Sequence, residues 1–187
     1  MFHFGVLFVA MGHVLGLAVP QSMTDALGVS HHAYHLIATV PGSIAGVVTI
    51  IGLLGLLYRR IFVKSIRLAT TRMDVIAYIL LAIPILLGAV ATFSTQVFGP
   101  DGGYNYRETI SVWFRSIPVL SPRPELMVGV PLVFQLHIIA GMLLFCIWPF
   151  TRLVHVVSAP VGYFTRPYVV YRSRRPADAT QPVPRGW

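Results

Sequence analysis

Seven histidines are the residues of this sequence that are best suited to chemistry. Imidazole is a good metal ligand and titrates near neutral pH, so it serves both cofactor binding and proton transfer. Four of the seven lie in or beside long apolar runs, where ionisable residues are costly and usually functional. These four are His3, His13, His137 and His155. The other three stand together in a polar connection, at His31, His32 and His35.

The spacing of the first four histidines suits two haem groups. His3 and His13 are ten residues apart, about 15 Å along a helix. His137 and His155 are eighteen apart, about 27 Å and five whole turns, so on one helix they share a face. If the two helices are antiparallel, each membrane side receives one imidazole from each helix, and two imidazoles complete a six-coordinate haem iron. The unequal spacings require tilt or a kink, which Pro149 can supply.

Other interpretations of the histidines stay open at this point. A lone histidine in a membrane span also hydrogen-bonds to a neighbouring helix or marks a proton path. A zinc or copper site needs three or four clustered ligands, and only His31, His32 and His35 are close enough in sequence. That trio has Asp25 alone as nearby carboxylate support.

The composition indicates that membrane helices position these residues. Of 187 residues, 56% are hydrophobic and 11% are charged, against about 25% charged in soluble domains, and the mean hydropathy is +0.74. Four long stretches lack Lys, Arg, Asp and Glu, and each approaches the ~20 residues of a membrane-spanning helix. We therefore predict an all-α integral membrane protein, a bundle of four transmembrane helices with haems held between the first and the last. The predicted spans are residues 2–19, 36–58, 75–98 and 126–149.

The basic residues predict the orientation, because Lys and Arg accumulate on the cytoplasmic side of a membrane. They gather after the second and fourth spans, so these segments and the C-terminus are predicted to be cytoplasmic. Three of them are also candidates for binding haem propionates, namely Arg59, Arg60 and Arg152. Residues 1–175 are expected to form the membrane domain and 176–187 a disordered tail. Topology and contact with membrane lipid explain the net charge of +8, and we expect no nucleic-acid partner.

Four stretches of the chain resemble the gamma subunit of membrane-bound respiratory nitrate reductase, the cytochrome b that anchors that complex. They are FHFGVLFVAMGHVLG (2–16), ATTRMD (69–74), ISVWFRS (110–116) and LHIIAGMLLFCIWPFTRLVHVVSAPVGYFTR (136–166). The histidine spacings match the family pattern as well, and the similarity covers nearly the whole chain up to Arg175.

This resemblance implies a path for electrons through two haem b groups. His13 and His137 would bind the outer, distal haem. His3 and His155 would bind the cytoplasmic, proximal haem, which is the pairing that topology gives independently. The family oxidises menaquinol or ubiquinol near the distal haem and passes the electrons to an iron–sulfur subunit and then to a molybdenum subunit that reduces nitrate. The chain is thus expected to be a quinol-oxidising subunit in a prokaryotic cell membrane that binds neither nitrate nor molybdenum.

Two features depart from the family pattern. Members normally have about five spans, with one helix before the stretch at which this chain begins, so that helix is expected to be absent here. In some members a lysine in the outer connection helps to bind quinol, whereas no lysine precedes Arg59 in this chain. We expect His31, His32 or His35 to replace it, because imidazole can donate to a quinone oxygen and accept a quinol proton. Gly12 is expected near this site, and a solvated interfacial cluster is the alternative for the trio.

The segment TISVWFRSI is expected to form an amphipathic helix at the outer interface. Its apolar residues Ile110, Trp113, Phe114 and Ile117 recur at helical spacing. Such a helix would cap the quinol site or anchor the loop.

Two rival functions are also consistent with the sequence. The first is a gamma-like dihaem cytochrome b of a heterodisulfide or sulfite-linked reductase. The second is a haem-free helical transporter, which would show no haem absorption.

Overall fold

The computed structural model describes residues 1–99, 103–156, 162 and 165–166, and every secondary-structure element in that part of the chain is helical. The α-helices are α1 (Phe2–Ala18), α2 (Gln21–Ala26), α3 (His31–Phe62), α4 (Lys64–Leu68), α5 (Arg72–Ala91), α6 (Ile110–Ser116) and α7 (Leu132–Ile147). The shorter elements are the π-helix η1 (Thr92–Val97) and the 3-10 helices η2 (Pro124–Met127), η3 (Trp148–Phe150) and η4 (Arg152–Val156). The prediction of an all-α chain is confirmed for these residues.

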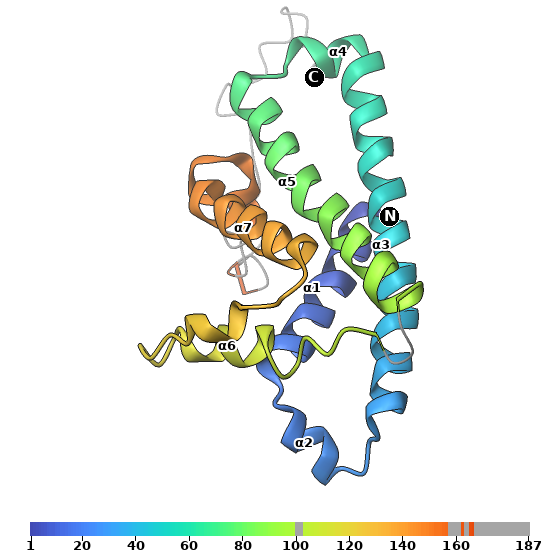
Figure 1. The fold of residues 1–187 in the computed structure, drawn as a ribbon. Coiled ribbons are helices and arrows are strands. Elements are labelled where there is room, and N and C mark those ends of the chain that lie inside the picture. Colours follow the sequence, from blue (N-terminus) through green and yellow to red (C-terminus); the bar gives the residue numbers. More distant parts are fainter. Residues whose placement is uncertain (100–102, 157–161, 163–164, 167–187) are drawn as a thin grey trace, which may run out of the picture. The chain divides into compact units, whose positions relative to one another are not determined.

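The chain divides into two compact units, Met1–Val154 and His155–Trp187. All the α-helices belong to the first unit, and Figure 1 shows them in order from α1 in blue to α7 in orange. The expected tail, residues 176–187, lies outside the described residues.

Polar caps explain where the two longest helices begin. The Ser30 hydroxyl accepts a hydrogen bond from the Ala33 N–H at 3.2 Å, so α3 begins five residues before the predicted span 36–58. At α5, Thr71 and Asp74 form a capping box, in which each side chain accepts from the backbone N–H of the other residue. These caps satisfy N–H groups that the first helical turn leaves without partners.

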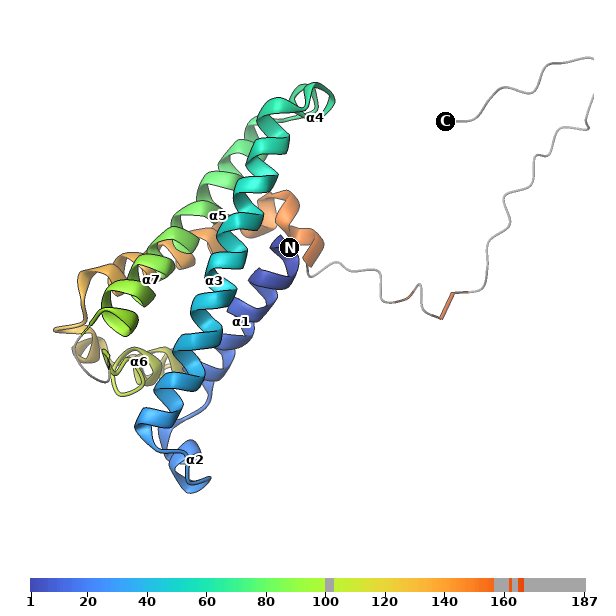
Figure 2. The ribbon, with the colours of Figure 1, turned by 90° about the vertical axis from the view of Figure 1, so that its right-hand side faces the viewer.

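Close packing of α1 against α3 depends on two glycines (Figure 2). A Cβ atom added at Gly5 would lie 2.6 Å from Oγ1 of Thr49, and one added at Gly52 would lie 2.6 Å from Cα of Phe2. Thr49 is 1% exposed, and its hydroxyl donates to the Ala45 carbonyl at 2.7 Å. Small residues that let helix backbones approach are the usual means of packing helices in lipid.

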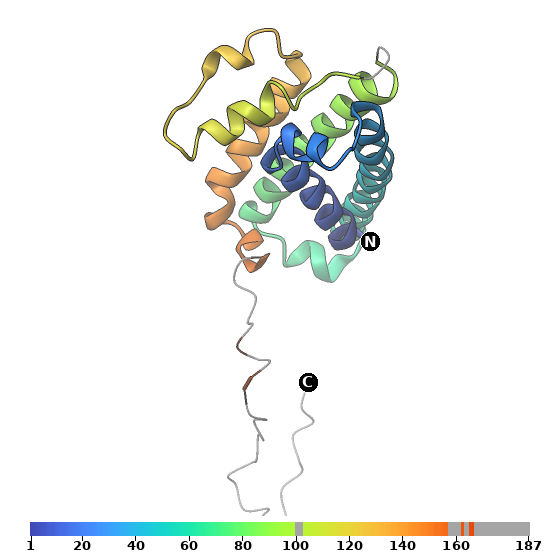
Figure 3. The ribbon, with the colours of Figure 1, turned by 90° about the horizontal axis from the view of Figure 1, so that it is seen from below.

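The first unit is built from two helix pairs, α1 with α3 and α5 with α7. The α3 and α5 helices also pack on each other, and α4 connects them at one end of the unit (Figure 1). The helices α2 and α6 lie at the opposite end, which we call the α2–α6 end, and this is the end that the sequence predicts to face outward. Seen from below, α1 lies between α3 on one side and α7 on the other (Figure 3).

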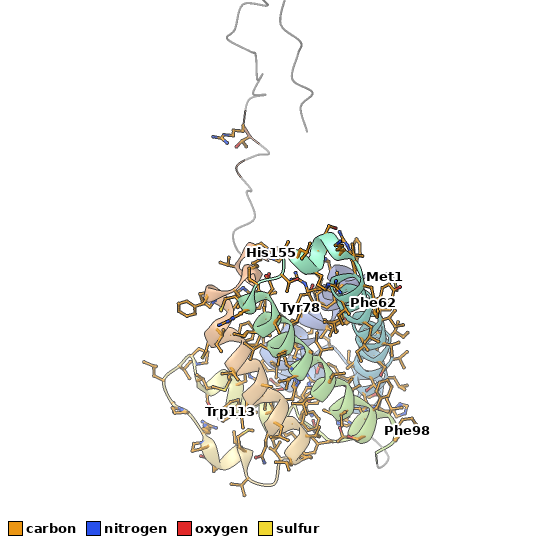
Figure 4. All side chains as sticks on the ribbon, turned by 90° about the horizontal axis from the view of Figure 1, so that it is seen from above. Met1, Phe62, Tyr78, Phe98, Trp113 and His155 are labelled. Carbon is orange, nitrogen blue, oxygen red and sulfur yellow. The ribbon has the colours of Figure 1, made fainter. Side chains whose placement is uncertain are left out.

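Three helices are long and apolar enough to cross a membrane, namely His31–Phe62, Arg72–Val97 and Leu132–Phe150. Helix α1 is apolar as well but has 17 residues, so three of the four predicted spans are confirmed and the four-span bundle stays a prediction. Large apolar side chains project from the outside of these helices (Figure 4), where Met1, Phe62 and Phe98 are 71%, 67% and 81% exposed. Lipid contact explains such an apolar surface.

The last span was predicted at residues 126–149, and the helical segment that could cross a membrane is Leu132–Phe150, so the predicted start was too early. The first residues of the predicted span form the 3-10 helix η2, and Gly129 takes a left-handed φ of +82°, so the α-helix begins only after Pro131. At the other end α7 stops at Ile147, because Pro149 has no N–H to continue the helical hydrogen bonding. The expectation that His137 and His155 share a helix face required one continuous helix and does not hold.

Candidate functional site

His13 of α1 and His137 of α7 are brought together between the two helix pairs. Their Nε2 atoms lie 3.5 Å apart, and the ring centroids are 5.7 Å apart with an angle of 35° between the ring planes. The two residues are 124 positions apart in the sequence, so the helix arrangement alone creates this pair.

Hydrogen bonds at the Nδ1 atoms determine which nitrogen of each ring carries a proton. Nδ1 of His13 bonds to the Val9 carbonyl at 2.8 Å, and Nδ1 of His137 bonds to the Pro84 carbonyl at 2.9 Å. A carbonyl oxygen only accepts, so each Nδ1 carries a proton and each ring directs its Nε2 toward the other ring. In the neutral tautomer with the proton on Nδ1, Nε2 has the lone pair with which imidazole binds a metal.

This donor set fits a haem iron. Metal-binding histidines usually donate the other ring N–H to a carbonyl or carboxylate, which fixes the tautomer and the ring orientation. A six-coordinate haem iron could take these two imidazoles and would not require a cluster of three or four protein ligands. Within the described part of the chain, no group of three or more His, Cys, Asp or Glu residues is placed to hold a metal ion, the trio His31, His32 and His35 included.

Helix α5 provides the surface on which the His137 ring rests. Besides the Pro84 carbonyl, α5 contributes Gly88, where an added Cβ would lie 2.9 Å from Cε1 and 3.2 Å from Nδ1 of His137. A side chain at this position would therefore displace the imidazole from its hydrogen bond. Gly88 thus acts as a positioning residue for His137.

We predict that Gly88→Ala disturbs the His137 ring and lowers the stability of the protein by about 1–2 kcal/mol, the usual cost of an overpacked interior. The measurements are the denaturation midpoint and the haem content of the purified chain, which should fall below that of wild type. Gly55→Ala is the matched control, because an added Cβ there meets nothing within 4 Å and alanine favours a helix by about 1 kcal/mol over glycine. Equal stability and haem content for wild type and Gly88→Ala would contradict this role.

The other predicted haem ligands lie in different units. His3 is in the first turn of α1, with its ring edge-on to Phe2 at a centroid distance of 5.9 Å. His155 is in η4 and belongs to the second unit. The pairing of His3 with His155 stays a prediction.

The histidine trio lies at the N-terminus of α3, at the α2–α6 end. His31 and His32 are exposed, whereas His35 is half-buried and its Nε2 atom is buried without a hydrogen-bond partner. A Cβ added at Gly103 would lie 2.7 Å from that Nε2, so His35 faces the connection between η1 and α6. Gly12 has no atom within 4 Å of an added Cβ, which leaves open space beside His13.

Sequence reasoning missed Arg107, which is the most deeply buried cation in the described residues. Its side chain is 3% exposed, Nη2 donates to Oγ1 of Thr24 at 3.0 Å, and Cζ lies 3.7 Å from the ring centroid of Tyr34. Its Nε atom is buried and has no hydrogen-bond partner. Arg107 lies in a polar connection between helices, where the sequence gives no sign that a charged residue is buried.

A neutral phenol stands beside this guanidinium. Burial and a hydrogen bond with Tyr34 raise the pKa of Tyr106 well above its usual value. The Tyr106 hydroxyl also packs on α1, because a Cβ added at Gly16 would lie 3.0 Å from it. The group is therefore protonated at physiological pH and supplies no negative charge to Arg107.

Helix α6 caps the C-terminus of α1. The Ser111 hydroxyl donates to the Gly16 carbonyl at 2.8 Å, and Nη1 of Arg115 donates to the Leu17 carbonyl at 2.8 Å. These donors satisfy terminal carbonyls of a helix that has no basic residue in its own last turn.

The predicted helix over TISVWFRSI is confirmed as α6, and its apolar residues divide between the interior and the surface. Ile110 is 5% exposed, whereas Phe114 and Ile117 are 42% and 41% exposed. The buried positions are Ile110, Ser111 and Ser116. Ser111 and Arg115 bind this helix to α1 through polar contacts, and the role of the exposed Phe114 and Ile117 at the membrane interface stays a prediction.

Near α4, the buried carboxylate of Asp74 forms ion pairs with two of the three arginines that were predicted to bind haem propionates. Asp74 is 4% exposed and binds Nη1 of Arg60 at 3.3 Å and Nε of Arg152 at 3.1 Å. The Asp74 carboxylate also accepts from the N–H and hydroxyl of Thr71. Arg59, the third candidate, is exposed.

Comparisons with known proteins agree on one family. Residues 1–174 match the family described as nitrate reductase gamma subunit. The chain is 51% identical over 188 residues to the nitrate reductase-like protein NarX of Mycobacterium tuberculosis (strain ATCC 25618 / H37Rv), covering 100% of this chain and 28% of that protein. It is 44% identical over 174 residues to the nitrate reductase gamma chain of Bacillus subtilis (strain 168), with 93% and 77% of the two chains covered.

A third relative extends the same pattern. The chain is 42% identical over 177 residues to the respiratory nitrate reductase 2 gamma chain of Escherichia coli (strain K12), covering 94% of this chain and 76% of the relative. The chain therefore spans about a quarter of the length of the mycobacterial protein but most of the length of the gamma chains.

Proposed function

Because the chain belongs to the nitrate reductase gamma subunit family, we propose that it is the dihaem cytochrome b subunit of a membrane-bound respiratory nitrate reductase. In this proposal it oxidises menaquinol or ubiquinol near the outer face of a prokaryotic cell membrane. The electrons then pass to a cytoplasmic iron–sulfur subunit and to a molybdenum subunit that reduces nitrate. All four membrane segments, α1 included, would span the bilayer, and the C-terminus would be cytoplasmic.

The observation that carries the proposal is the pair His13 and His137, with Nε2 atoms 3.5 Å apart. These residues would hold the distal haem b, and His3 and His155 would hold the proximal haem b. Bound haem supplies one-electron transfer, so two haems at different depths divide the path across the membrane. The chain itself would hold the haem through Nε2 of His13 and His137, whose rings are oriented by hydrogen bonds from Nδ1 to the carbonyls of Val9 and Pro84.

The α2–α6 end offers the groups that quinol oxidation needs. Quinol loses two protons and two electrons to become quinone, so the site must accept protons beside the distal haem. His35 has a buried Nε2 without a hydrogen-bond partner and is the best placed of the trio to take a proton. His31 and His32 are exposed and would pass the proton onward to solvent.

The first experiment is a reduced-minus-oxidised visible spectrum of the purified chain with pyridine haemochrome quantitation, followed by addition of menaquinol or ubiquinol. We expect about two b haems per chain and their reduction by quinol. The haem-free transporter predicts no haem band in a well-folded sample. A dihaem subunit of a heterodisulfide or sulfite-linked reductase would give the same spectrum, and copurification of a molybdenum-containing nitrate reductase subunit separates the two.

A further inference from the structure

Arg107 is a buried cation whose surroundings leave its charge unpaired. Moving a guanidinium out of water is costly unless a carboxylate or several acceptors replace the lost hydration. Here the observed partners are one threonine hydroxyl and the face of Tyr34, while Nε has no hydrogen-bond partner. Among the described residues, no carboxylate forms an ion pair with Arg107.

The neighbouring groups do not supply the missing anion. The raised pKa of Tyr106 keeps its phenol neutral. The carboxylate of Glu108 accepts a hydrogen bond at 2.6 Å from the Asn105 side chain and is exposed. An acceptor oxygen from outside the chain would therefore find a desolvated positive charge that no carboxylate of the described residues neutralises.

The neighbours of Arg107 connect it with the segments that contain His13 and His35. Tyr106, next to Arg107, packs on Gly16, which is three residues and about 4.5 Å of helix beyond His13. Tyr34, on which the guanidinium stacks, is followed directly by His35 with its unpartnered Nε2. Arg107, whose Nε lacks a hydrogen-bond partner, thus contacts Tyr34, and His35, whose Nε2 lacks one, is the next residue of α3.

We propose that Arg107 binds an oxygen of the quinol headgroup and is a substrate-binding residue of this chain. The proposal rests on the proposed function and adds a residue that neither the histidine spacing nor the family pattern indicated. When the quinol O–H bond breaks, the proton goes to Nε2 of His35 and the electron pair stays on the quinol oxygen. The Arg107 guanidinium stabilises that developing negative charge, because a preorganised cation in a dry site is most effective where charge appears.

The test uses the full, haem-loaded chain and the probe 2,3-dimethyl-1,4-naphthoquinol. Rapid mixing gives the rate of haem reduction against quinol concentration, and equilibrium dialysis measures binding of the oxidised probe without any turnover. For Arg107→Gln we expect at least a tenfold higher half-saturating concentration, about tenfold weaker binding in dialysis and an unchanged haem content. Arg107→Lys, which keeps the charge but loses the planar donors, should fall between wild type and Arg107→Gln.

Arg123→Gln is the matched control, because Arg123 is an exposed arginine of the same connection and should leave both values unchanged. Half-saturation and dialysis values for Arg107→Gln within twofold of wild type would overturn the proposal. If Arg107→Gln does not fold, Arg107→Lys decides, and wild-type values for that variant overturn the proposal as well. A wild-type chain that binds the probe but is not reduced by it contradicts the proposed function alone, since dialysis still reports on Arg107.

Discussion

Replacing His13 with alanine is expected to lower the haem content from about two haem b groups per chain to about one. The distal site would lose one of the two Nε2 atoms that face each other at 3.5 Å, and a single imidazole at His137 does not complete a six-coordinate iron. The proximal haem should persist, because its predicted ligands are His3 and His155. Pyridine haemochrome quantitation measures the loss, and a redox titration should show one component in place of two.

Chemical rescue distinguishes a lost ligand from a misfolded protein. His13→Gly leaves space where the ring stood, so imidazole added during haem loading can supply the missing nitrogen and return the second haem. His31→Ala is the matched histidine control, because His31 is exposed and lies outside the facing pair, so its haem content should equal wild type. Two haems in His13→Ala, or an equal loss in His31→Ala, would rule out the assignment of the distal ligand.

Much of the helical framework could be predicted because long runs without charged residues approach the length of a membrane-spanning helix. The first run predicted residues 2–19 and α1 is Phe2–Ala18. The third predicted 75–98, and the helical segment is Arg72–Val97. The fourth was predicted to start at residue 126 but starts at Leu132, because Gly129 and Pro131 are counted as apolar or neutral in a hydropathy pattern although their backbones interrupt a helix.

The candidate site, too, could be predicted only in part. Depth in the membrane follows from residue number along a helix, so the proximity of His13 and His137 followed from antiparallel spans. The contacts that position the His137 ring could not be predicted in this way. The Pro84 carbonyl and the space at Gly88 depend on how α5 packs against α7. The burial of Arg107 could not be predicted either, because it arises when a polar connection folds onto α2 and α3.

Asp74→Ala is expected to destabilise the first unit by about 3 kcal/mol. The substitution removes the capping box of α5, worth about 1 kcal/mol, and leaves the half-buried Arg60 without its carboxylate, which costs a few kcal/mol more in a buried pair. The ion pair with Arg152 adds little, because that side chain is 71% exposed and screened by solvent. For a chain of this size the denaturation midpoint should fall by about 6–12 °C.

Two further variants identify which interaction is responsible. Asp74→Asn keeps acceptors for Thr71 but loses the charge, so its stability should lie between Asp74→Ala and wild type. A double-mutant cycle of Asp74→Ala with Arg60→Ala should give a coupling energy of about 1–2 kcal/mol, because the two side chains meet at 3.3 Å. Asp25→Ala is the control, as Asp25 is exposed and should change stability by less than about 0.5 kcal/mol. A coupling energy near zero would show that Asp74 stabilises α5 through the cap alone, and an unchanged midpoint for Asp74→Ala would mean that the buried carboxylate does not hold α3 and α5 together.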